Sequence, residues 1–249
     1  MGPLLETTQA LIDRSGVLLV FASVIVFELP RYLFATVALA LDGLRRHRAA
    51  SVAPATGTVS IVIPTLNDAG NILRTVRHAR ASDPPPLEII VIDDGSTDGT
   101  AALLEQARQD GLVDRVITHA TRAGKSAACN HGARFASGDF ILFLDSDAAI
   151  QPGAVRGLLA AFDSDAIAAA SGNLAPRNKD ESLTTSVQAI EYLVSVTGGR
   201  SFLEAFGANA CCSGAFVMFR AATFAAAGGY DVGSGEDLEI TLRLRRLGY

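Results

Sequence analysis

The sequence predicts an α/β protein with a mostly parallel sheet flanked by helices. Short apolar runs of strand length at 59–63, 87–92 and 140–144 alternate with segments of helical spacing at 71–81, 100–110 and 126–136. This alternation is typical of β-α-β units. The run at 140–144 is apolar throughout, as in strands buried on both faces. Two of these runs stop at paired acidic residues, which predicts a polar site at one edge of the sheet.

Residues 1–48 precede these units and predict a membrane anchor. The chain has 249 residues, 49% of them hydrophobic, and a mean hydropathy of +0.30, more apolar than a typical soluble domain. The excess lies at about 11–44, where one transmembrane helix kinked at Pro30 would contain the roughly 20 apolar residues that a span needs. Two short embedded segments and a signal peptide are the alternatives. A signal peptide normally begins with basic residues, whereas residues 2–13 contain none.

Three arginines follow the apolar stretch, namely Arg45, Arg46 and Arg48. The positive-inside rule therefore predicts a protein of the inner (plasma) membrane whose remaining chain is cytoplasmic. Residues 49–57 are small and include Pro and Gly, as in a linker, and the predicted domain covers 58–249. Within it, the first strand should stop at Pro64, a further strand should cover 113–118, and 184–196 should form an amphipathic helix. That helix could lie on the membrane or on the sheet, and we favour the sheet.

Composition excludes several classes of function. A net charge of −5 and the absence of Trp disfavour nucleic acid as a partner. The three cysteines, Cys129, Cys211 and Cys212, fit neither a disulfide framework nor a zinc site, and we expect small buried residues in a reducing compartment. The four histidines share no metal-ligand spacing.

Asp145 and Asp147 directly follow the strand at 140–144. Side chains two residues apart on an extended segment point the same way, so both carboxylates should project from the carboxyl end of the strand. Hard oxygen ligands suit Mg²⁺ or Mn²⁺, which usually completes its shell with water and phosphate. A diphosphate is therefore the expected ligand. The alternative is a simple polar turn.

Asp93 and Asp94 close the strand at 87–92 and should lie on the same edge of the sheet. Carboxylates there could accept hydrogen bonds from a ring N–H or a ribose hydroxyl, although Asp-Asp-Gly-Ser is also ordinary turn chemistry. Lys125, in a glycine loop before a helix, would bring a cation to this acidic site. The alternative is a solvated surface lysine, because the loop does not match a Walker A motif.

Four motifs in this order resemble family 2 glycosyltransferases with the GT-A (Rossmann-like) fold: Val-Ile-Pro-Thr-Leu-Asn-Asp at 62–68, Val-Ile-Asp-Asp-Gly-Ser-Thr-Asp at 91–98, Gly-Lys-Ser-Ala-Ala-Cys-Asn at 124–130 and Leu-Asp-Ser-Asp at 144–147. Later segments at 171–173, 212–216, 228–230 and 235–237 are similar to the membrane-bound synthases of β-linked polysaccharides. Those enzymes include chitin-oligosaccharide, poly-N-acetylglucosamine, hyaluronan and cellulose synthases.

The resemblance implies a metal-dependent inverting enzyme that transfers a sugar from a UDP-sugar to a growing glycan or a lipid-linked acceptor. Asp237 would be the general base, Asp147 with Asp145 would hold the metal, and Asp145 would also contact the nucleotide. The other implied substrate-binding residues are Pro64, Thr65, Asp68, Asp93 and Asp94 around uridine, Lys125 near the nucleotide, Ser213 and Gly214 near the acceptor, and Glu236. From the residues alone, Glu236 and Asp237 could simply be acids in the first turn of a helix.

Three departures from the family pattern matter. Leu66 replaces a frequent aromatic residue and Asp68 a frequent Glu, which affects the expected contacts to the base. The Gln-x-x-Arg-Trp segment that follows in processive members is missing, so the chain resembles a truncated member. The alternatives are therefore a catalytically incomplete nucleotide-sugar-binding subunit that needs a partner chain for the missing C-terminal part, a non-processive lipid-phosphate glycosyltransferase, and, more remotely, a sugar-phosphate nucleotidyltransferase.

Overall fold

The computed structural model describes residues 55–176, 181–200, 211–231 and 235–249, together with 203, 233 and, near the N-terminus, 16, 19, 22–30, 32–34, 36–37, 40–41 and 43. The chain divides into two compact units. One comprises Met1–Ala50 and Leu174–Asn209, and the other, called here the sheet unit, comprises Ser51–Asn173 and Ala210–Tyr249.

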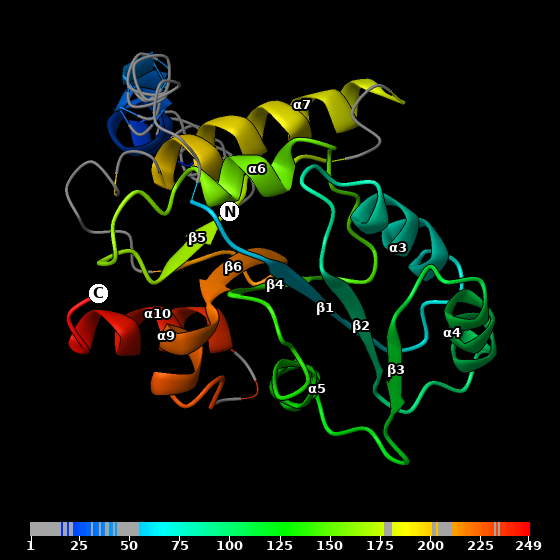
Figure 1. Ribbon diagram of the computed structural model, residues 1–249. Coiled ribbons are helices and arrows are strands. Elements are labelled where there is room, and N and C mark those ends of the chain that lie inside the picture. The colour runs from blue at the N-terminus through cyan, green and yellow to red at the C-terminus, as the bar shows by residue number, and fades with distance from the viewer. Residues whose placement is uncertain are drawn as a thin grey trace, which may run out of the picture. The chain divides into compact units, whose positions relative to one another are not determined.

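The sheet unit is built on six strands in the order β3-β2-β1-β4-β6-β5. Strands β3, β2, β1 and β4 are parallel, β6 is antiparallel to β4, and β5 is antiparallel to β6. The prediction of a mostly parallel sheet is therefore confirmed (Figure 1). The strands are β1 (Val59–Thr65), β2 (Glu88–Asp93), β3 (Arg115–Thr118), β4 (Phe140–Leu144), β5 (Ala169–Ser171) and β6 (Phe216–Arg220).

Helices connect the parallel strands, as the sequence predicts. In Figure 1, α5, α9 and α10 lie below the sheet, α6 lies above it, and α3 and α4 lie beside β2 and β3. Helix α10 has three acidic residues in its first turn and three arginines in its last, an arrangement that complements the helix dipole. The helices are α3 (Ile72–Arg80), α4 (Thr100–Gln109), α5 (Lys125–Ala133), α6 (Ala154–Leu159), α9 (Ala221–Ala226) and α10 (Glu236–Arg246).

The core of the sheet unit is centred on β4, which is buried at all five positions. Phe143 on β4 contacts the rings of Phe219, Phe224 and Tyr230, with centroids 5.0 to 5.9 Å apart. These rings join β4 and β6 to α9 and to the segment before α10, and tilted aromatic pairs contribute about 0.5–1.5 kcal/mol each beyond their buried area. The apolar run at 140–144 is thus a strand buried on both faces, as predicted.

Strand β1 does not stop at Pro64, contrary to the prediction. It continues to Thr65 and pairs with β2 along its length, with Pro64 opposite Ile92. Pairing with β4 on the other side ends at Val62. Proline is tolerated in a strand where no ladder bond needs its missing N–H, and beyond Val62 β1 has no neighbour on the β4 side that would require one.

The other unit contains η1 (Val24–Glu28), α7 (Leu183–Glu191) and η2 (Tyr192–Gly198). Helix α7 starts with a capping box between Ser182 and Thr185, so a helix is present where the amphipathic helix was predicted. None of its residues is buried, so the packing on the sheet that we favoured is not confirmed. The predicted anchor at 11–44 and the linker at 49–57 fall partly outside the described residues. In the part of the chain that is described, no helix combines the length and the apolar character that crossing a membrane requires.

Candidate functional site

A pocket of about 450 Å³ opens at the carboxyl ends of β1 and β4. In the strand order, these neighbours mark the point where the chain reverses direction across the sheet, which is where open α/β sheets bind ligands. The pocket is lined by Pro64, Thr65, Leu66, Asn67, Asp68, Asn71, Asp94, Arg122, Lys125, Ala128, Asp145, Ser146 and Asp147. Seven of the predicted site residues are in this lining.

Lys125 is the residue that joins the pocket to the predicted acceptor side. Its Nζ lies 2.6 Å from Asp145 Oδ1 and 4.0 Å from Glu236 Oε1, and it donates a hydrogen bond of 3.0 Å to the carbonyl oxygen of Gly214. Burial lowers the pKa of Lys125, but the attraction of Asp145 outweighs it and the net shift is upward. The ammonium group therefore stays charged at neutral pH, and it links the end of β4, the loop before β6 and the start of α10.

The loop after β4 is fixed by helix α3. The Thr75 hydroxyl is buried and lies 2.6 Å from the carbonyl oxygen of Ser146 and 2.8 Å from that of Ala148. The loop itself turns through a bond from the Ala148 N–H to the Asp145 carbonyl. Asp147 is exposed, and no described residue forms an ion pair with it. Its carboxylate is thus held over the pocket with its oxygens available to a ligand.

Asp93 and Asp94 have different environments. Asp93 is fully buried, and its Oδ1 accepts a hydrogen bond from the Ser96 N–H. Asp94 accepts bonds of 2.8 Å from the N–H groups of Ala123 and Gly124. Burial raises the pKa of Asp94, but the hydrogen bonds from Ala123, His119 and Gly124 together lower it below its usual value. Asp94 lines the pocket, but its charge serves mainly to fix the loop before α5.

Two histidines extend the contacts of Asp94. His119 Nδ1 lies 2.7 Å from Asp94 Oδ1, and His119 Nε2 lies 2.8 Å from His131 Nδ1. The two rings are stacked, with centroids 5.1 Å apart. The chain Asp94–His119–His131 therefore connects the end of β2 to the last turn of α5.

Three buried oxygens at the pocket end of β1 and β2 have no hydrogen-bond partner among the described residues: Thr65 Oγ1, Asp68 Oδ2 and Asp93 Oδ2. Buried polar atoms are normally paired. Asp68 uses its other oxygen to accept a bond from Asn71. Thr65 and Asp68 line the pocket, so a polar ligand that supplies donors there would satisfy their oxygens, whereas Asp93 is fully buried and is not in the lining.

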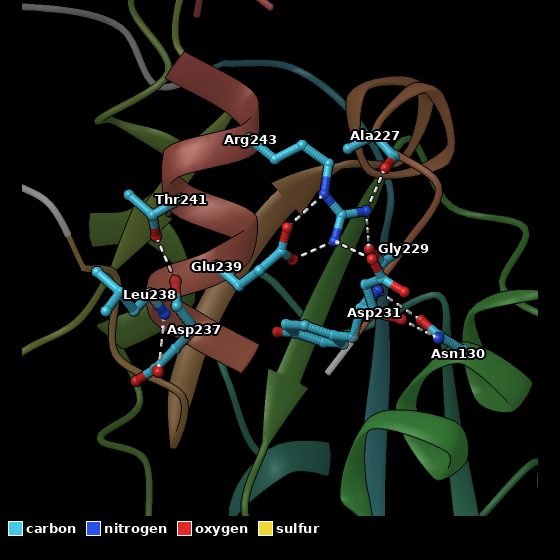
Figure 2. A network of polar contacts seen from close by, with 10 residues as sticks. Asn130, Ala227, Gly229, Asp231, Asp237, Leu238, Glu239, Thr241 and Arg243 are labelled. Atoms are coloured by element: carbon cyan, nitrogen blue, oxygen red, sulfur yellow. Dashed lines mark hydrogen bonds and ion pairs between the residues drawn. The ribbon is translucent and has the colours of Figure 1, made fainter. Parts of the chain in front are cut away.

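The remaining predicted residues lie around the start of α10. Ser213 is buried, and Glu236 and Asp237 form the first turn of the helix. A Cβ on Gly214 would lie 3.4 Å from Asp237 Oδ2, an ordinary van der Waals contact, so position 214 lies directly beside the carboxylate. Asp237 accepts a bond from the Leu238 N–H (Figure 2). The structure thus brings Asp237 next to Gly214, whose carbonyl oxygen is bound by Lys125.

Sequence reasoning missed several pocket residues, above all Asn67, Asn71 and Arg122. Asn67 has a positive φ of 51°, and its side-chain oxygen accepts a bond from the Thr97 N–H. Asparagine tolerates this conformation better than most residues, which is a usable sequence signal. Arg122 lies three residues before Lys125 in the same basic loop. No cluster of three His, Cys, Asp or Glu side chains that could hold a metal occurs among the described residues, so Asp145 and Asp147 would need ligands from substrate and water.

Residues 60–225 match the family model of glycosyl transferase family 2, which is more than half of the chain. An N-acetylglucosaminyltransferase of Azorhizobium caulinodans is 30% identical over 171 residues, covering 67% of this chain and 43% of the relative. A hyaluronan synthase of Streptococcus pyogenes is 32% identical over 168 residues, covering 65% and 40%. The chain thus matches less than half the length of these relatives.

Solved structures share the fold. A mannosyltransferase from Pyrobaculum calidifontis in complex with GDP-Man and Mn²⁺ superposes with a TM-score of 0.63 at 22% identity, covering 88% of this chain and 65% of that protein. Residues 1–349 of TarS from S. aureus in complex with UDP-GlcNAc give a TM-score of 0.53 at 20% identity, covering 75% and 53%. At these identities the likeness concerns the fold.

Proposed function

This chain belongs to glycosyl transferase family 2, and from that membership we propose that it is a metal-dependent inverting enzyme using a UDP-sugar. The acceptor would be a hydroxyl of a growing glycan or of a lipid-linked molecule at the cytoplasmic face of the membrane. The observation that supports this most is the position of Lys125, which contacts Asp145, Gly214 and Glu236 from three separate motifs. Donor and acceptor groups would therefore meet beside one cation.

The donor nucleotide would lie over the ends of β1 and β2. The unpaired oxygens of Thr65 and Asp68, which line the pocket, would accept hydrogen bonds from the base and the ribose, which both carry donors. Asp93 is fully buried beneath them and would support this end of the pocket. Lys125 would face the diphosphate, because a charged donor stabilises phosphate oxygens strongly. The solved neighbours in complex with UDP-GlcNAc and GDP-Man support a nucleotide-sugar donor.

Asp147 and Asp145 would hold Mg²⁺ or Mn²⁺ together with the diphosphate. Their chemistry fits, since both are hard oxygen donors and Asp147 is exposed. When bound, the ion would neutralise the charge that develops on the departing diphosphate. The Mn²⁺ bound by the mannosyltransferase neighbour supports use of a divalent cation.

Asp237 would act as the general base on the acceptor hydroxyl. Inverting transfer needs a base on the side opposite the leaving group, and a carboxylate within hydrogen-bond reach of the attacking hydroxyl can remove its proton. Its position beside Gly214 leaves backbone rather than side chain next to the carboxylate, so an acceptor could approach there. Glu236, 4.0 Å from Lys125, would help to hold the cation in place.

The test is the variant Asp237→Asn. We expect transfer from the UDP-sugar to fall about 100- to 10,000-fold. UDP should still bind with unchanged affinity in calorimetry, because the proposed nucleotide contacts lie at the ends of β1, β2 and β4 and not on α10. Asp163→Asn, at an exposed position, is the matched control and should leave both quantities unchanged. Turnover at the normal rate in the Asp237→Asn enzyme would remove Asp237 from its role.

The polymer product and any partner are separate proposals. The named relatives, an N-acetylglucosaminyltransferase and a hyaluronan synthase, support glycan extension, but this chain matches less than half of their length. Sizing of the products by chromatography would separate processive extension from a single transfer. Strong transfer by the 249-residue chain alone would exclude a subunit that needs a partner chain to complete its site.

A further inference from the structure

The segment between α9 and α10 turns sharply at two glycines. Gly228 and Gly229 have φ values of +83° and +75°, a region that other residues occupy only at a cost. A Cβ on Gly229 would lie 2.5 Å from Asn130 Oδ1. Residues 227–231, called here the 227–231 turn, can therefore approach helix α5 closely only because position 229 lacks a side chain.

Helix α5 holds the 227–231 turn from one side. The Asn130 side-chain amide donates to the Tyr230 carbonyl oxygen at 2.7 Å, and its Oδ1 accepts from the Tyr230 N–H at 2.8 Å (Figure 2). Both backbone groups of Tyr230 are thus satisfied by one side chain. Asn130 lies on the same short helix as Lys125, so the turn is fixed relative to the residue that contacts Asp145 and Glu236.

Helix α10 holds the same turn from the other side. Arg243 donates from one terminal nitrogen to the carbonyl oxygens of Ala227, at 2.5 Å, and Gly229, at 2.9 Å. Its Nε donates to Glu239 at 2.9 Å, its second terminal nitrogen forms an ion pair with Glu239, and Asp231 lies 3.8 Å away (Figure 2). The planar fork of a guanidinium can make all these bonds at once, which an ammonium cannot.

Helix α10 is also attached to the loop before β6, through the Thr241 hydroxyl. The Thr241 hydroxyl donates to the Asp237 carbonyl oxygen at 2.6 Å and accepts from the Cys212 N–H at 3.0 Å. Cys212 directly precedes Ser213 and Gly214. Helix α10 is thus attached both to the loop that passes Asp237 and, through Arg243, to the turn that Asn130 fixes on α5.

We infer that Arg243 and Asn130 are positioning residues for the acceptor half of the reaction. By holding the 227–231 turn between α5 and α10, they set the position of Asp237 and Glu236 relative to Lys125. Neither residue lines the pocket, so neither would touch the donor. This inference rests on the proposed function, because it assigns the contacts to transfer rather than to nucleotide binding.

The experiment compares Arg243→Gln, Arg243→Lys and Asn130→Asp with the wild-type protein. A shift of about 1 Å in a reacting group can lower a rate about 100-fold, so we expect kcat for transfer to fall about 10- to 100-fold in Arg243→Gln. Arg243→Lys should recover part of it, since one carbonyl can still be reached. Asn130→Asp should lower kcat as well, because the carboxylate would face the Tyr230 carbonyl oxygen. The Kd for UDP should change less than about threefold, since the donor contacts are intact.

The control is Arg246→Gln, three residues further along α10. Arg246 is exposed, and no ion pair joins it to a described residue, so kcat and Kd should both stay at wild-type values. Thermal unfolding of every variant identifies those that fail to fold.

Three outcomes would overturn the inference. The first is an unchanged kcat in Arg243→Gln. The second is a loss of kcat accompanied by weaker UDP binding and a lower melting temperature, since that pattern indicates a structural role only. A wild-type protein that binds UDP but transfers no sugar would overturn the proposed function together with this inference, and the first two outcomes are distinct from it because there the wild type is active.

Discussion

Replacing Asp94 with Asn tests whether this carboxylate organises the loop before α5. The two oxygens of Asp94 accept three hydrogen bonds, from Ala123, Gly124 and His119. An amide has one acceptor oxygen only. If that oxygen keeps the bonds from Ala123 and His119, the new NH₂ group faces the Gly124 N–H, and two donors then point at one another.

The cost follows from these contacts. A buried donor left without an acceptor costs about 1–3 kcal/mol, and hydrogen bonds to a charged group are stronger than neutral ones by about 1 kcal/mol each. One lost and two weakened bonds therefore give a destabilisation of about 3–5 kcal/mol. For a chain of this size 1 kcal/mol corresponds to a shift of about 2–4 °C in Tm, so we expect Tm to fall by roughly 6–20 °C.

The assay is thermal unfolding followed by circular dichroism, combined with hydrogen exchange of the Ala123 and Gly124 amides. Both amides should lose protection in Asp94→Asn. The affinity for UDP should also fall, because Lys125, which would face the diphosphate, directly follows this loop. The pH adds a second readout. The pKa of Asp94 is lowered by folding, so its stabilisation is present above the unfolded value of about 3.9 and is lost as the pH falls through the folded pKa. The Asn variant should lack this part of the acid dependence.

Asp163→Asn is the control, because its carboxylate is exposed, and it should melt within about 1 °C of the wild type. If Asp94→Asn had the same Tm as this control and the Gly124 amide stayed protected from hydrogen exchange, Asp94 would not be the group that fixes the loop.

Three further predictions concern the core and the cation. Gly132→Ala should destabilise the protein by about 1–3 kcal/mol in urea unfolding, since the new Cβ would lie 2.4 Å from Val62 Cγ1, whereas Gly157→Ala, with open space around it, should not; equal stability of the two would contradict the packing. Cys129 should not react with a thiol reagent until the protein unfolds, because burial raises its pKa; labelling of Cys129 in the native protein would refute this. Removing divalent ions with EDTA should abolish transfer, and Asp147→Asn should raise the Mn²⁺ concentration needed to restore it; full activity in EDTA would exclude metal dependence.

The fold was predictable where a strand contains a run of apolar or β-branched residues that ends at turn residues, as in β1, β2, β3 and β4. The parallel core of β1, β2 and β4 and the helices between them follow from local pattern and turn residues. Strands β5 and β6 were not predicted. Ala169–Ser171 is only three residues long, and its pairing with β6 depends on contacts between residues about 50 positions apart, which no local pattern contains. The prediction that β1 stops at Pro64 was wrong for a related reason, because whether a strand tolerates proline depends on the strands that pair with it.

The site was predictable in composition and less so in its internal contacts. The acidic strand ends, Lys125 and the Glu-Asp pair gather around one region, as the motif order implies. The different environments of Asp93 and Asp94 could not be predicted from the sequence, because the hydrogen bonds of Asp94 come from His119 and from backbone N–H groups of a loop some 30 residues away. The role of Arg243 could not be predicted from the sequence either. An arginine near the end of a helix is common because it complements the helix dipole, and only the structure shows which carbonyl oxygens it binds.

Helix α5 is the element that connects the two halves of the proposed reaction. Its first residues are fixed by Asp94 through the Gly124 N–H, on the nucleotide side, and Asn130 fixes the 227–231 turn and hence α10 on the other side. The helix is nine residues long and is packed against β1 and β2 through Ala128 and Cys129. A short, buried helix has little freedom to tilt, since core side chains are close-packed. A substitution at Asp94 should therefore displace Asp237 as well, and should lower kcat in addition to weakening UDP binding. A substitution at Arg243 acts on the far side of α5 from the nucleotide and should lower kcat alone.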